Sequence, residues 1–357
     1  MLHEFRDKSI AKRLSGRIRK ISKDMGHIKI MHVCGTHEYT ITRFGIRSLL
    51  PENIEVISGP GCPVCVTTTR EIDEAILLSK NEDVIVTTFG DMLRVPGSES
   101  SLVDAKSRGC DVRVVYSISD AVEIARENSR REVIHVAIGF ETTSPSTAVE
   151  IRNAPENFSI LNCHRLIPPA MEFLMESGNV KINGFINPGH VSTIIGLRPY
   201  YKISEKYNVP QVIAGFEPND VLFAILILLD MIKNGEFEVR NEYSRVVREE
   251  GNLRAIKAIN EVFKPSDVKW RGFPEIPGSG LKLRNRFLKY DAREKFDINL
   301  RNSKEPKGCR CGDILKGTIH PRECPLFSKI CIPENPIGPC MVSMEGACAI
   351  AYRYGSE

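Results

Sequence analysis

Eight short runs of β-branched and other apolar residues constrain the fold of this chain more than any other feature of its sequence. They begin roughly 20 to 30 residues apart, which is the length of one strand followed by one helix. The runs are continuously apolar instead of alternating, as expected of strands that are buried on both faces of a parallel sheet. The sequence therefore predicts an α/β fold with parallel strands at residues 28–34, 54–58, 83–89, 111–117, 132–140, 158–164, 182–188 and 210–216.

The predicted strands could form one large sheet or two smaller sheets, and we favour two. The tripeptide Gly-Phe-Glu occurs at residues 139–141 and again at residues 215–217, in both cases where a predicted strand ends. This repetition indicates paired halves. We therefore expect two similar parallel-sheet, Rossmann-like α/β domains, comprising residues 28–130 and residues 131–240. Helices are expected in the gaps, for example at residues 70–78.

The C-terminal region, residues 241–357, has a different composition. A helix is predicted at residues 248–263, and the Gly- and Pro-rich residues 270–281 are expected to form a loop. From Gly308 onward, too few apolar residues remain for an independent core. We therefore expect a metal or a covalent link to stabilise this part as a small domain. Residues 1–27 are expected to form a helix that packs on it.

The composition argues against several classes of protein. The most apolar segment, residues 221–232, is short and contains Asp230, which indicates a buried core helix and not a membrane span. The N-terminal residues are too charged for a secretory signal peptide. The net charge of +4 is small, and no arginine–aromatic pattern indicates binding to nucleic acid. We expect a cytoplasmic protein.

The chain contains 11 cysteines, which is many for a cytoplasmic protein of this size. Disulfides are rare in a reducing compartment, so metal binding or thiol chemistry is the leading interpretation. Three cysteines lie near the N-terminus and six lie within residues 309–348. Cys110 and Cys163 stand alone and are expected to serve packing.

Residues with catalytic or ligand chemistry follow the carboxyl ends of the predicted strands, where open α/β sheets bind their ligands. The candidates are Cys34, His37, Cys62, Cys65, Asp91, Glu141, His190 and Glu217. Asp91, Glu141 and Glu217 could act as acids or bases, or they could only cap helices. His190 is interpreted as a residue of a ligand-binding cleft at these strand ends.

The motif Cys62-Pro-Val-Cys65 precedes a helix whose start is marked by the capping-box pattern Thr68-x-x-Glu71. The positive end of a helix dipole lowers the pKa of a nearby thiol and favours the thiolate. Such a pair suits reversible disulfide chemistry or binding of a soft metal. The alternative is half of a zinc knuckle, although the chain has no second C-x-x-C motif to complete it.

Cys34 also lies at a predicted strand-to-helix turn, where Gly35 allows close approach of the backbone. His37 follows one helical turn later, so that its ring could lie near the sulfur of Cys34. We interpret Cys34 as a reactive thiolate or an iron ligand, because thiolates are soft ligands. The alternative is a small buried residue without chemistry.

The C-terminal region offers more thiols than one tetrahedral metal site needs: Cys309, Cys311, Cys324, Cys331, Cys340 and Cys348. Four thiolates suit either zinc or an iron–sulfur cluster. The long gaps between these cysteines lack the tight C-x-x-C knuckles of most structural zinc sites, which favours a cluster. No Walker A loop, G-x-G-x-x-G motif or radical S-adenosylmethionine motif is present, so nothing indicates nucleotide chemistry.

Together these motifs resemble the HypD family of [NiFe] hydrogenase maturation proteins, in the expected order and over essentially the whole chain. The resemblance implies two similar α/β domains with a cleft between them and a small, mainly C-terminal iron–sulfur domain. The motifs that carry it are Cys34-Gly-Thr-His37-Glu, Gly-Pro-Gly-Cys62-Pro-Val-Cys65, Thr-Phe-Gly-Asp91, Arg94-Val-Pro-Gly, Gly-Phe-Glu141-Thr-Thr, Pro-Gly-His190-Val-Ser and Cys324-Pro-Leu-Phe.

The resemblance also implies roles for individual cysteines. Cys34 matches the thiol that holds the iron of the Fe(CN)2CO group, and Cys62 and Cys65 match a redox-active pair. The implied ligands of a [4Fe–4S] cluster are Cys311, Cys324, Cys331 and Cys348. Cys309 and Cys340 fall outside this pattern, and either could replace one of those ligands.

The implied partners are a small HypC-type chaperone, a HypE-type protein that donates cyanide, and indirectly the hydrogenase large subunit. In this interpretation the protein is an assembly scaffold with a redox role and not a conventional turnover enzyme. One alternative is a freestanding [4Fe–4S]-dependent thiol–disulfide oxidoreductase, in which a cluster reduces the Cys62/Cys65 pair. Another is a zinc-stabilised binding scaffold without redox chemistry.

Overall fold

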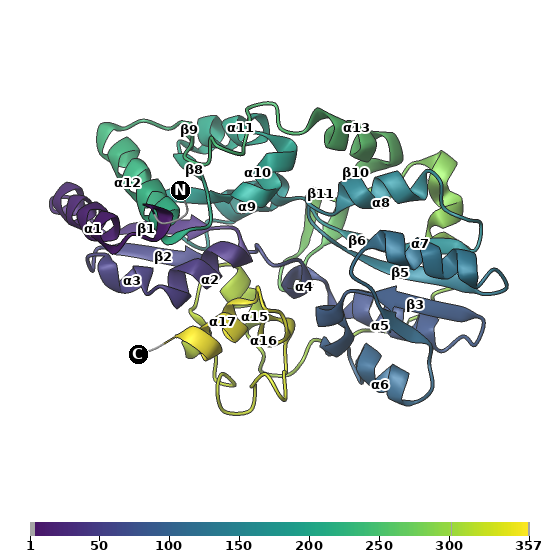
Figure 1. Ribbon diagram of the computed structural model, residues 1–357. Coiled ribbons are helices and arrows are strands. Elements are labelled where there is room, and N and C mark those ends of the chain that lie inside the picture. Colours follow the sequence, from purple (N-terminus) through teal and green to yellow (C-terminus); the bar gives the residue numbers. More distant parts are fainter. Residues whose placement is uncertain (1–3, 301, 356–357) are drawn as a thin grey trace.

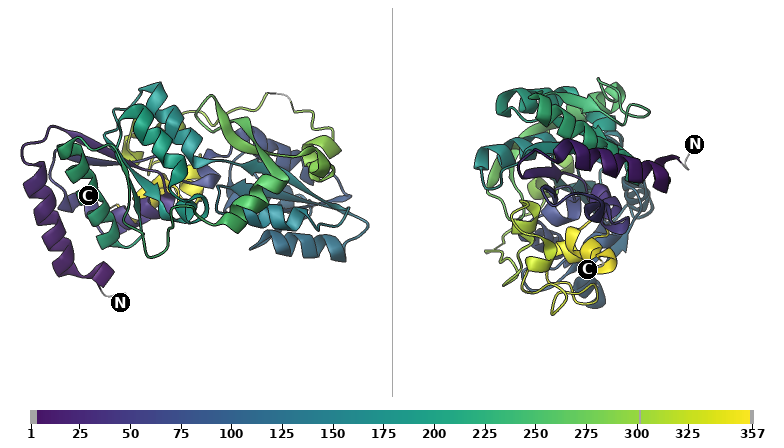
Figure 2. Two further views of the ribbon diagram at one scale, coloured as in Figure 1. Left: turned by 90° about the horizontal axis from the view of Figure 1, so that it is seen from above. Right: turned by 90° about the vertical axis from the view of Figure 1, so that its left-hand side faces the viewer.

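The computed structural model describes residues 4–300 and 302–355 and contains two parallel sheets side by side, each covered by helices (Figure 1). The cysteine-rich C-terminal segment lies near the middle of the molecule, close to where the two sheets meet (Figure 2). The predicted α/β class with two parallel, Rossmann-like sheets is confirmed. Each of the eight apolar runs contains a strand.

The first sheet has five parallel strands in the order β2 (Ile54–Ser58), β1 (Ile28–His32), β7 (Gly184–Pro188), β8 (Gln211–Ala214) and β9 (Val239–Asn241). The second has four parallel strands in the order β4 (Val112–Val114), β3 (Val84–Thr88), β5 (Glu132–Gly139) and β6 (Phe158–His164). Most residues of the other strands are buried, in keeping with their continuous apolar pattern, whereas the edge strands β4 and β9 are largely not.

The sheets do not follow the predicted boundaries of residues 28–130 and 131–240. β1 and β2 belong to the same sheet as β7, β8 and β9, and Ile30 of β1 pairs with Gly184 of β7. The chain therefore leaves the first sheet after β2, builds the whole second sheet, and then returns. The spacing of apolar runs reveals how many strand–helix units a chain has, but a parallel strand need not pair with its neighbour in sequence.

Helices connect the strands and cover both sheets. Those as far as β10 are α1 (Lys8–Ser22), α2 (Gly35–Arg43), α3 (Ile46–Leu49), α4 (Pro63–Val66), α5 (Thr69–Ser79), α6 (Leu102–Ser107), α7 (Ile118–Glu127), α8 (Ser144–Ile151), α9 (Ile167–Ser177), α10 (Gly189–Ile195), α11 (Arg198–Tyr207), α12 (Pro218–Asn234) and α13 (Leu253–Val262). The 3₁₀ turns η1 (Glu4–Arg6) and η2 (Gly90–Arg94) belong to the same part of the chain. Within the described ranges, no helix combines the length and the apolar character that a membrane span requires.

Helix α1 packs along α12 at one end of the molecule, and not on the C-terminal region as expected (Figure 1). Its side chains Leu14 and Ile18 are buried in the same apolar cluster as Ile225 and Leu229 of α12. Helix α12 is apolar on most of its circumference and is buried, as predicted for residues 221–232. A helix that is apolar all round needs cover on the side facing away from the sheet, and α1 provides it.

The prediction of a loop at residues 270–281 is wrong. Strands β10 (Phe263–Lys269) and β11 (Glu275–Leu283) form an antiparallel hairpin that includes most of this stretch. Gly280 is required there because a Cβ atom would overlap the side chain of Val268 on the partner strand. A two-stranded ribbon has two free edges and therefore tolerates proline, so the glycine and proline content did not indicate a loop.

The C-terminal region wraps around the junction of the two sheets and has little core of its own. Its elements are η3 (Asn285–Tyr290), α14 (Ala292–Lys295), α15 (Cys311–Leu315), η4 (Pro321–Glu323), α16 (Pro339–Val342) and α17 (Ala347–Tyr354). Its buried cysteines and apolar side chains belong to one apolar cluster with residues of both sheets. Cys311 and Cys340 form a disulfide in this region, whereas the sequence favoured metal binding or thiol chemistry over structural disulfides.

Candidate functional site

A cavity of about 500 Å³ lies where loops from both sheets meet. Its walls come from the segments that follow β1, β2 and β7 in the first sheet and β5 in the second, together with the C-terminal region. The polar lining side chains are Cys34, Thr142, Thr143, His190, Thr193, Tyr243 and Glu345. The cavity thus lies beyond the carboxyl ends of parallel strands, where the sequence places the candidate residues.

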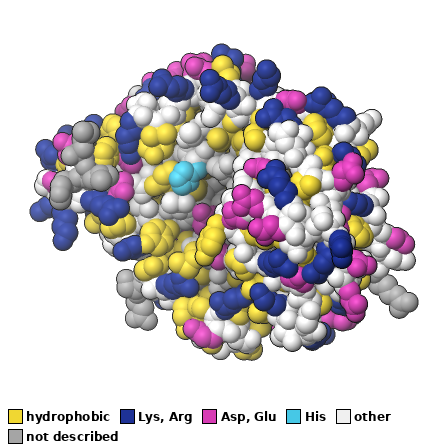
Figure 3. All heavy atoms as spheres, turned by 45° about the vertical axis from the view of Figure 1, so that its right-hand side comes forward, with side chains coloured by type: hydrophobic (Ala, Val, Ile, Leu, Met, Phe, Trp, Pro, Cys, Tyr) yellow, Lys and Arg dark blue, Asp and Glu magenta, His cyan; other side chains and the backbone are white. Residues whose placement is uncertain are grey.

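The face shown in Figure 3 is hollowed beside a histidine side chain, with charges of both signs spread around it. Among the described residues that line the cavity there is no lysine or arginine. Its polar lining consists of hydroxyl, thiol, imidazole and carboxyl groups. The cavity therefore offers hydrogen-bond donors without a fixed positive side chain.

Cys34 lies two residues after the end of β1 and is the N-cap residue of α2. The N–H of Gly35 donates to the carbonyl oxygen of Gly61 over 3.2 Å, so the loop that carries Cys62 crosses Cys34 closely. A Cβ atom at Gly61 would overlap the backbone of Val33 and Cys34, which explains the glycine at this position. The structure therefore brings together Cys34 and the Cys62 loop.

The thiol of Cys34 is buried and lies beside an acidic group. Burial raises its pKa to about 11, and the carboxylate of Glu345 acts in the same direction. The N–H groups of Thr36 and His37 at the start of α2 oppose this shift. The thiol is therefore protonated at neutral pH, and a metal ion that binds to it must displace the proton.

Cys62 and Cys65 form a disulfide with their Cα atoms 5.2 Å apart. Cys62 is the N-cap residue of α4, and its sulfur accepts the N–H of Cys65 over 3.2 Å. The predicted capping box of Thr68 and Glu71 is present at the start of α5. Both sulfurs are buried, so Gly61 and Pro63 of this loop face the cavity instead.

His37 was expected to bring its ring near Cys34, but its hydrogen bonds lead elsewhere. Its Nε2 atom donates to the carbonyl oxygens of Ala214 and Gly215 over 3.3 and 3.0 Å, which ties α2 to the end of β8. Burial lowers the pKa of His37 to about 3. A ring that stays neutral and donates to the backbone serves to anchor the helix.

His32, which the sequence analysis did not single out, holds the turn at Cys34 in place through hydrogen bonds. Its Nδ1 atom donates to the carbonyl oxygen of Cys34 over 3.1 Å, and its Nε2 atom lies 2.7 Å from a carboxylate oxygen of Glu38. Burial opposes ionisation of Glu38, but Arg47 and His32 outweigh it and hold the pKa of Glu38 well below its usual range. This buried network fixes the backbone that presents the thiol.

His190 and Glu141 lie at or next to the cavity. The ring of His190 stacks on Phe216 with centroids 3.9 Å apart, and burial lowers its pKa. Glu141 precedes the cavity residues Thr142 and Thr143 and is almost fully buried. Both carboxyl oxygens of Glu141 accept the N–H of Ile167, and burial raises its pKa to about 7.

Asp91 and Glu217 do not line the cavity. Asp91 accepts the N–H of Met344 over 3.3 Å and thereby connects η2 to the C-terminal region. Glu217 is the N-cap residue of α12 and pairs with Arg6, to which it is joined by a hydrogen bond of 2.8 Å. Helix capping and an ion pair therefore account for the position of Glu217.

Glu345 is a residue of the cavity that sequence reasoning missed. It lies over Gly35, where any Cβ atom would overlap the side chain and backbone of Glu345. Burial raises its pKa, and the nearby Asp91 adds to the effect. The only signal for it in the sequence is indirect, because Gly35 leaves room for close approach without indicating which residue approaches.

The C-terminal cysteines surround a second, smaller cavity with apolar neighbours such as Ile314, Leu326 and Met341. Six thiol positions line it: Cys309, Cys311, Cys324, Cys331, Cys340 and Cys348. Cys311 and Cys340 are joined by a disulfide, whereas the other four are free. We name these four free thiols, Cys309, Cys324, Cys331 and Cys348, the cysteine cage.

The cage differs from the predicted ligand set in one residue. Cys311, one of the implied ligands, is bonded to Cys340, whereas Cys309, which falls outside the implied set, is free and lines the same cavity. Burial raises the pKa of the Cys348 thiol, and charges on Cys331, Cys309 and Cys324 act in the same direction. Within the described part of the chain, no three His, Cys, Asp or Glu side chains are arranged to hold a single metal ion.

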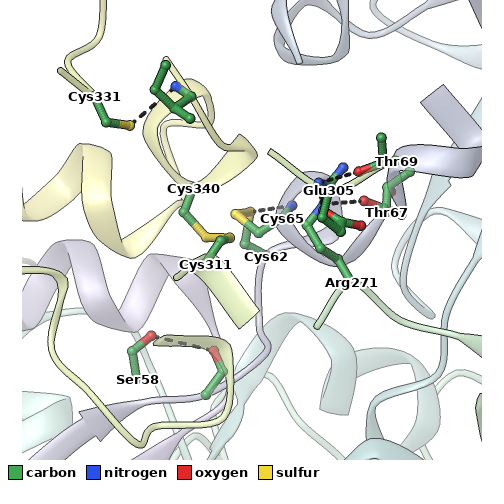
Figure 4. The surroundings of a disulfide bond; sticks show 12 residues. Ser58, Cys62, Cys65, Thr67, Thr69, Arg271, Glu305, Cys311, Cys331 and Cys340 are labelled. Carbon is green, nitrogen blue, oxygen red and sulfur yellow. Dashed lines mark hydrogen bonds and ion pairs between the residues drawn. A yellow bond between two sulfur atoms is a disulfide. The ribbon is translucent and has the colours of Figure 1, made fainter. Parts of the chain in front are cut away.

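The two disulfides are neighbours. Figure 4 shows the Cys311–Cys340 bond beside Cys62 and Cys65. Helix α4, which carries Cys65, packs against both α15 and α16. These sites thus lie next to one another in the middle of the molecule. The cysteine cage adjoins the Cys311–Cys340 disulfide, which adjoins the Cys62–Cys65 disulfide, and the Cys62 loop borders the cavity at Cys34.

Comparison with known proteins identifies the family to which this arrangement belongs. The sequence profile of HypD, described as the hydrogenase formation hypA family, matches residues 9–355. The chain belongs to the HypD family. A hydrogenase expression/formation protein of Methanocaldococcus jannaschii is 53% identical, over 98% of each chain.

Further HypD relatives have the same extent. The hydrogenase maturation factor HypD2 of Bradyrhizobium diazoefficiens is 48% identical over 99% of this chain and 96% of its own. The hydrogenase maturation factor HypD of Cupriavidus necator is 47% identical over 99% of this chain and 97% of its own. The resemblance inferred from the motifs is confirmed, and it extends over nearly the whole chain.

Proposed function

We propose that this chain is a hydrogenase maturation factor that serves as the scaffold on which the Fe(CN)2CO group of [NiFe] hydrogenases is assembled. In this proposal it acts with a HypC-type chaperone, receives cyanide from a HypE-type protein, and supplies the hydrogenase large subunit. The names of its relatives support the general role. The observation that carries the scaffold role is the contact between Cys34 and the Cys62 loop at the rim of one cavity.

Cys34 is the proposed anchor of the iron. Iron that carries cyanide and carbonyl ligands needs a soft, electron-rich ligand, which a thiolate provides. When the metal displaces the proton of Cys34, the N–H groups at the start of α2 stabilise the thiolate. Thr142 and His190 on the cavity wall offer donors to the cyanide nitrogens, and the ring of Phe140 contributes apolar surface.

The Cys62–Cys65 pair is the proposed two-electron store for ligand attachment. Reduction of the disulfide takes up two electrons and two protons and yields two thiols, and oxidation returns them. Because the pair is buried behind Gly61 and Pro63, bulk thiols have poor access to it. Electrons are therefore expected to arrive through the protein.

The donor set of the cysteine cage fits a [4Fe–4S] cluster, and we propose Cys309, Cys324, Cys331 and Cys348 as its ligands. A cluster held there would exchange single electrons, so reduction of a disulfide requires two successive transfers. The adjacent Cys311–Cys340 pair offers a route. Exchange between its two thiols and the Cys62–Cys65 disulfide moves two electrons and two protons together, with one disulfide formed and one broken.

The proposal is tested by Cys34→Ala in a complex co-purified anaerobically with its HypC-type partner. We expect the variant to lose the iron of the Fe(CN)2CO group together with the cyanide and carbonyl infrared bands, while the cluster absorbance is unchanged. Cys163→Ala is a matched control, because Cys163 is equally buried in β6 and does not line the cavity. Full iron content and infrared bands in Cys34→Ala would reject the role.

The adjacent disulfides also favour a second candidate function, a freestanding thiol–disulfide oxidoreductase. This function predicts turnover with a disulfide substrate by the isolated chain, without a HypC-type partner. A Cys62→Ser variant should abolish that turnover, whereas the scaffold function predicts none in either protein. A colourless, zinc-containing preparation would contradict both candidates.

A further inference from the structure

Phe216, the central residue of the second Gly-Phe-Glu tripeptide, packs against two histidine rings. The ring of His190 stacks on it, with the centroids 3.9 Å apart and the planes inclined by 24°. The centroid of the His37 ring lies 5.0 Å from that of Phe216, with the planes inclined by 30°. Packing of this kind between aromatic rings is favourable. We name His37, Phe216 and His190 the ring stack.

The segment that carries Phe216 is held by α2, the helix that begins directly after Cys34. His37 donates through Nε2 to the two carbonyl oxygens that precede Phe216, over 3.3 and 3.0 Å. One turn later on α2, the hydroxyl of Thr40 donates to the carbonyl oxygen of Phe216 itself over 2.6 Å. The helix that presents Cys34 therefore also sets the position of Phe216.

His190, at the end of the ring stack, lines the same cavity as Cys34. In the part of the chain that the structure describes, neither ring nitrogen of His190 has a hydrogen-bond partner. A histidine side chain rotates about two bonds, so only packing can fix the direction of a ring that has no hydrogen bond. Contact with Phe216 supplies this packing and leaves both ring nitrogens for a ligand in the cavity.

Tyr243 holds the ring stack from the side. Its ring meets Phe216 edge-on, with centroids 5.8 Å apart and planes at 79°, and it also lines the cavity. Gly189, next to His190, leaves room for it, because a Cβ atom there would lie 2.9 Å from the tyrosine ring. The guanidinium of Arg245 lies over the Tyr243 ring, 4.5 Å from its centroid. The direction of His190 thus depends on α2 and on the segments that follow β8 and β9.

We propose that Phe216 is a positioning residue that directs an N–H group of His190 at a cyanide nitrogen of the iron group on Cys34, and that His37 acts on the cavity through Phe216. The inference rests on the proposed function, since it presumes that Cys34 holds this group. A neutral imidazole has one N–H donor, and a cyanide nitrogen is an acceptor. A donor whose direction is fixed in advance binds without the entropy cost of ordering its side chain.

The first test is infrared spectroscopy of the full chain co-purified anaerobically with its HypC-type partner. A hydrogen bond to the nitrogen of a metal-bound cyanide raises the C–N stretching frequency. His190→Ala should therefore shift one cyanide band to lower wavenumber without loss of iron. Phe216→Leu should shift the same band in the same direction, although His190 is still present.

Two further variants separate positioning from general packing. Phe216→Tyr keeps an aromatic ring against His190 and should leave the cyanide band at its wild-type position. Phe158→Leu is the matched control, because Phe158 is fully buried in β6 and does not line the cavity. It removes the same aromatic ring from a core position and should leave the band unshifted.

The second test is nuclear magnetic resonance of the histidine-labelled chain without iron, in which His190→Ala identifies the signals of His190. An aromatic ring shifts the signals of protons that lie over its face upfield. Phe216→Leu should move the His190 ring signals downfield, and His37→Ala should move them as well. His135→Ala is the control, since His135 packs against Phe89 instead.

The outcomes are distinct. An unshifted cyanide band in His190→Ala or in Phe216→Leu, with iron retained, would overturn the inference, and so would unchanged His190 signals in Phe216→Leu. If Phe216→Leu does not fold, His37→Ala decides, because unchanged His190 signals there would refute an action through Phe216. A wild-type complex without cyanide bands would instead contradict the proposed function itself.

Discussion

Glu141 is a carboxyl group that the protein buries without an opposite charge beside it. Its hydrogen bonds come from one backbone N–H at the start of α9, and burial raises its pKa from 4.5 to about 7. An acid with a raised pKa in the folded state destabilises that state when it ionises. The cost is absent below about pH 4.5, develops as the pH rises, and is complete above about pH 7.

Glu141→Gln should therefore flatten the pH dependence of stability. The full cost is on the order of 3 kcal/mol, so the midpoint of urea unfolding should fall less between pH 5 and pH 8 in the variant than in the wild type. Some dependence remains, because burial also raises the pKa of Glu242 to about 7. Equal slopes in both proteins would show that Glu141 is not buried as an acid.

Single residues also mark the limit of what the sequence could reveal at the site. Cys34, His190 and Glu345 line one cavity, and the first two were predicted to lie at the carboxyl ends of strands. Glu345 could not be predicted, because it reaches the cavity from a segment without regular spacing. His37 was expected beside Cys34, but which way a helical side chain points depends on its neighbours, here the carbonyl groups after β8.

At the scale of elements, the loop before α4 is shaped to cross the start of α2. Gly61→Ala should push the two segments apart, because the added methyl group overlaps the backbone at Cys34. We expect a loss of about 1–3 kcal/mol in stability. Under the proposed function, iron retention is also lost while the absorbance of the proposed cluster is preserved.

Gly26→Ala is the matched control for this substitution, since a Cβ atom there meets nothing within 4 Å. Chemical unfolding and iron analysis of both variants check the prediction. If Gly61→Ala retains iron and stability as well as Gly26→Ala, the loop is not held against Cys34.

Strands were predictable and their partners were not. All eight apolar runs contain strands because burial on both faces leaves a clear signature. The pairing of β1 with β7 depends on contacts between residues more than 150 positions apart, which no local pattern records. The hairpin of β10 and β11 was missed because its glycines and prolines are allowed by free edges and by close packing at Val268.

At the scale of the whole molecule, the cysteine cage is assembled from the segments around α15, η4 and α17. Cys309 and Cys311 are separated by one residue, so their spacing to the later cysteines could not decide which belongs to the cage. Only the tertiary structure distinguishes the two cysteines, because it brings Cys340 to Cys311 and leaves Cys309 free.

This arrangement predicts different results for two neighbouring substitutions. If the proposed cluster occupies the cage, Cys309→Ser should lose it, seen as loss of visible absorbance and of iron and acid-labile sulfide, because a cage thiolate is removed. Cys311→Ser should retain the cluster, with Cys110→Ser as a control outside the cage. The opposite pattern would restore Cys311 as a ligand.

The path of the chain has a consequence for the order in which the protein is made. A ribosome produces β1 and β2 first, but their sheet is completed only when β7, β8 and β9 emerge, after the entire second sheet. The loop with Cys34 thus waits for more than 150 further residues before its strand gains its second neighbour. Among the residues that line the cavity, Glu345 is synthesised last, so the cavity is complete only near the end of translation.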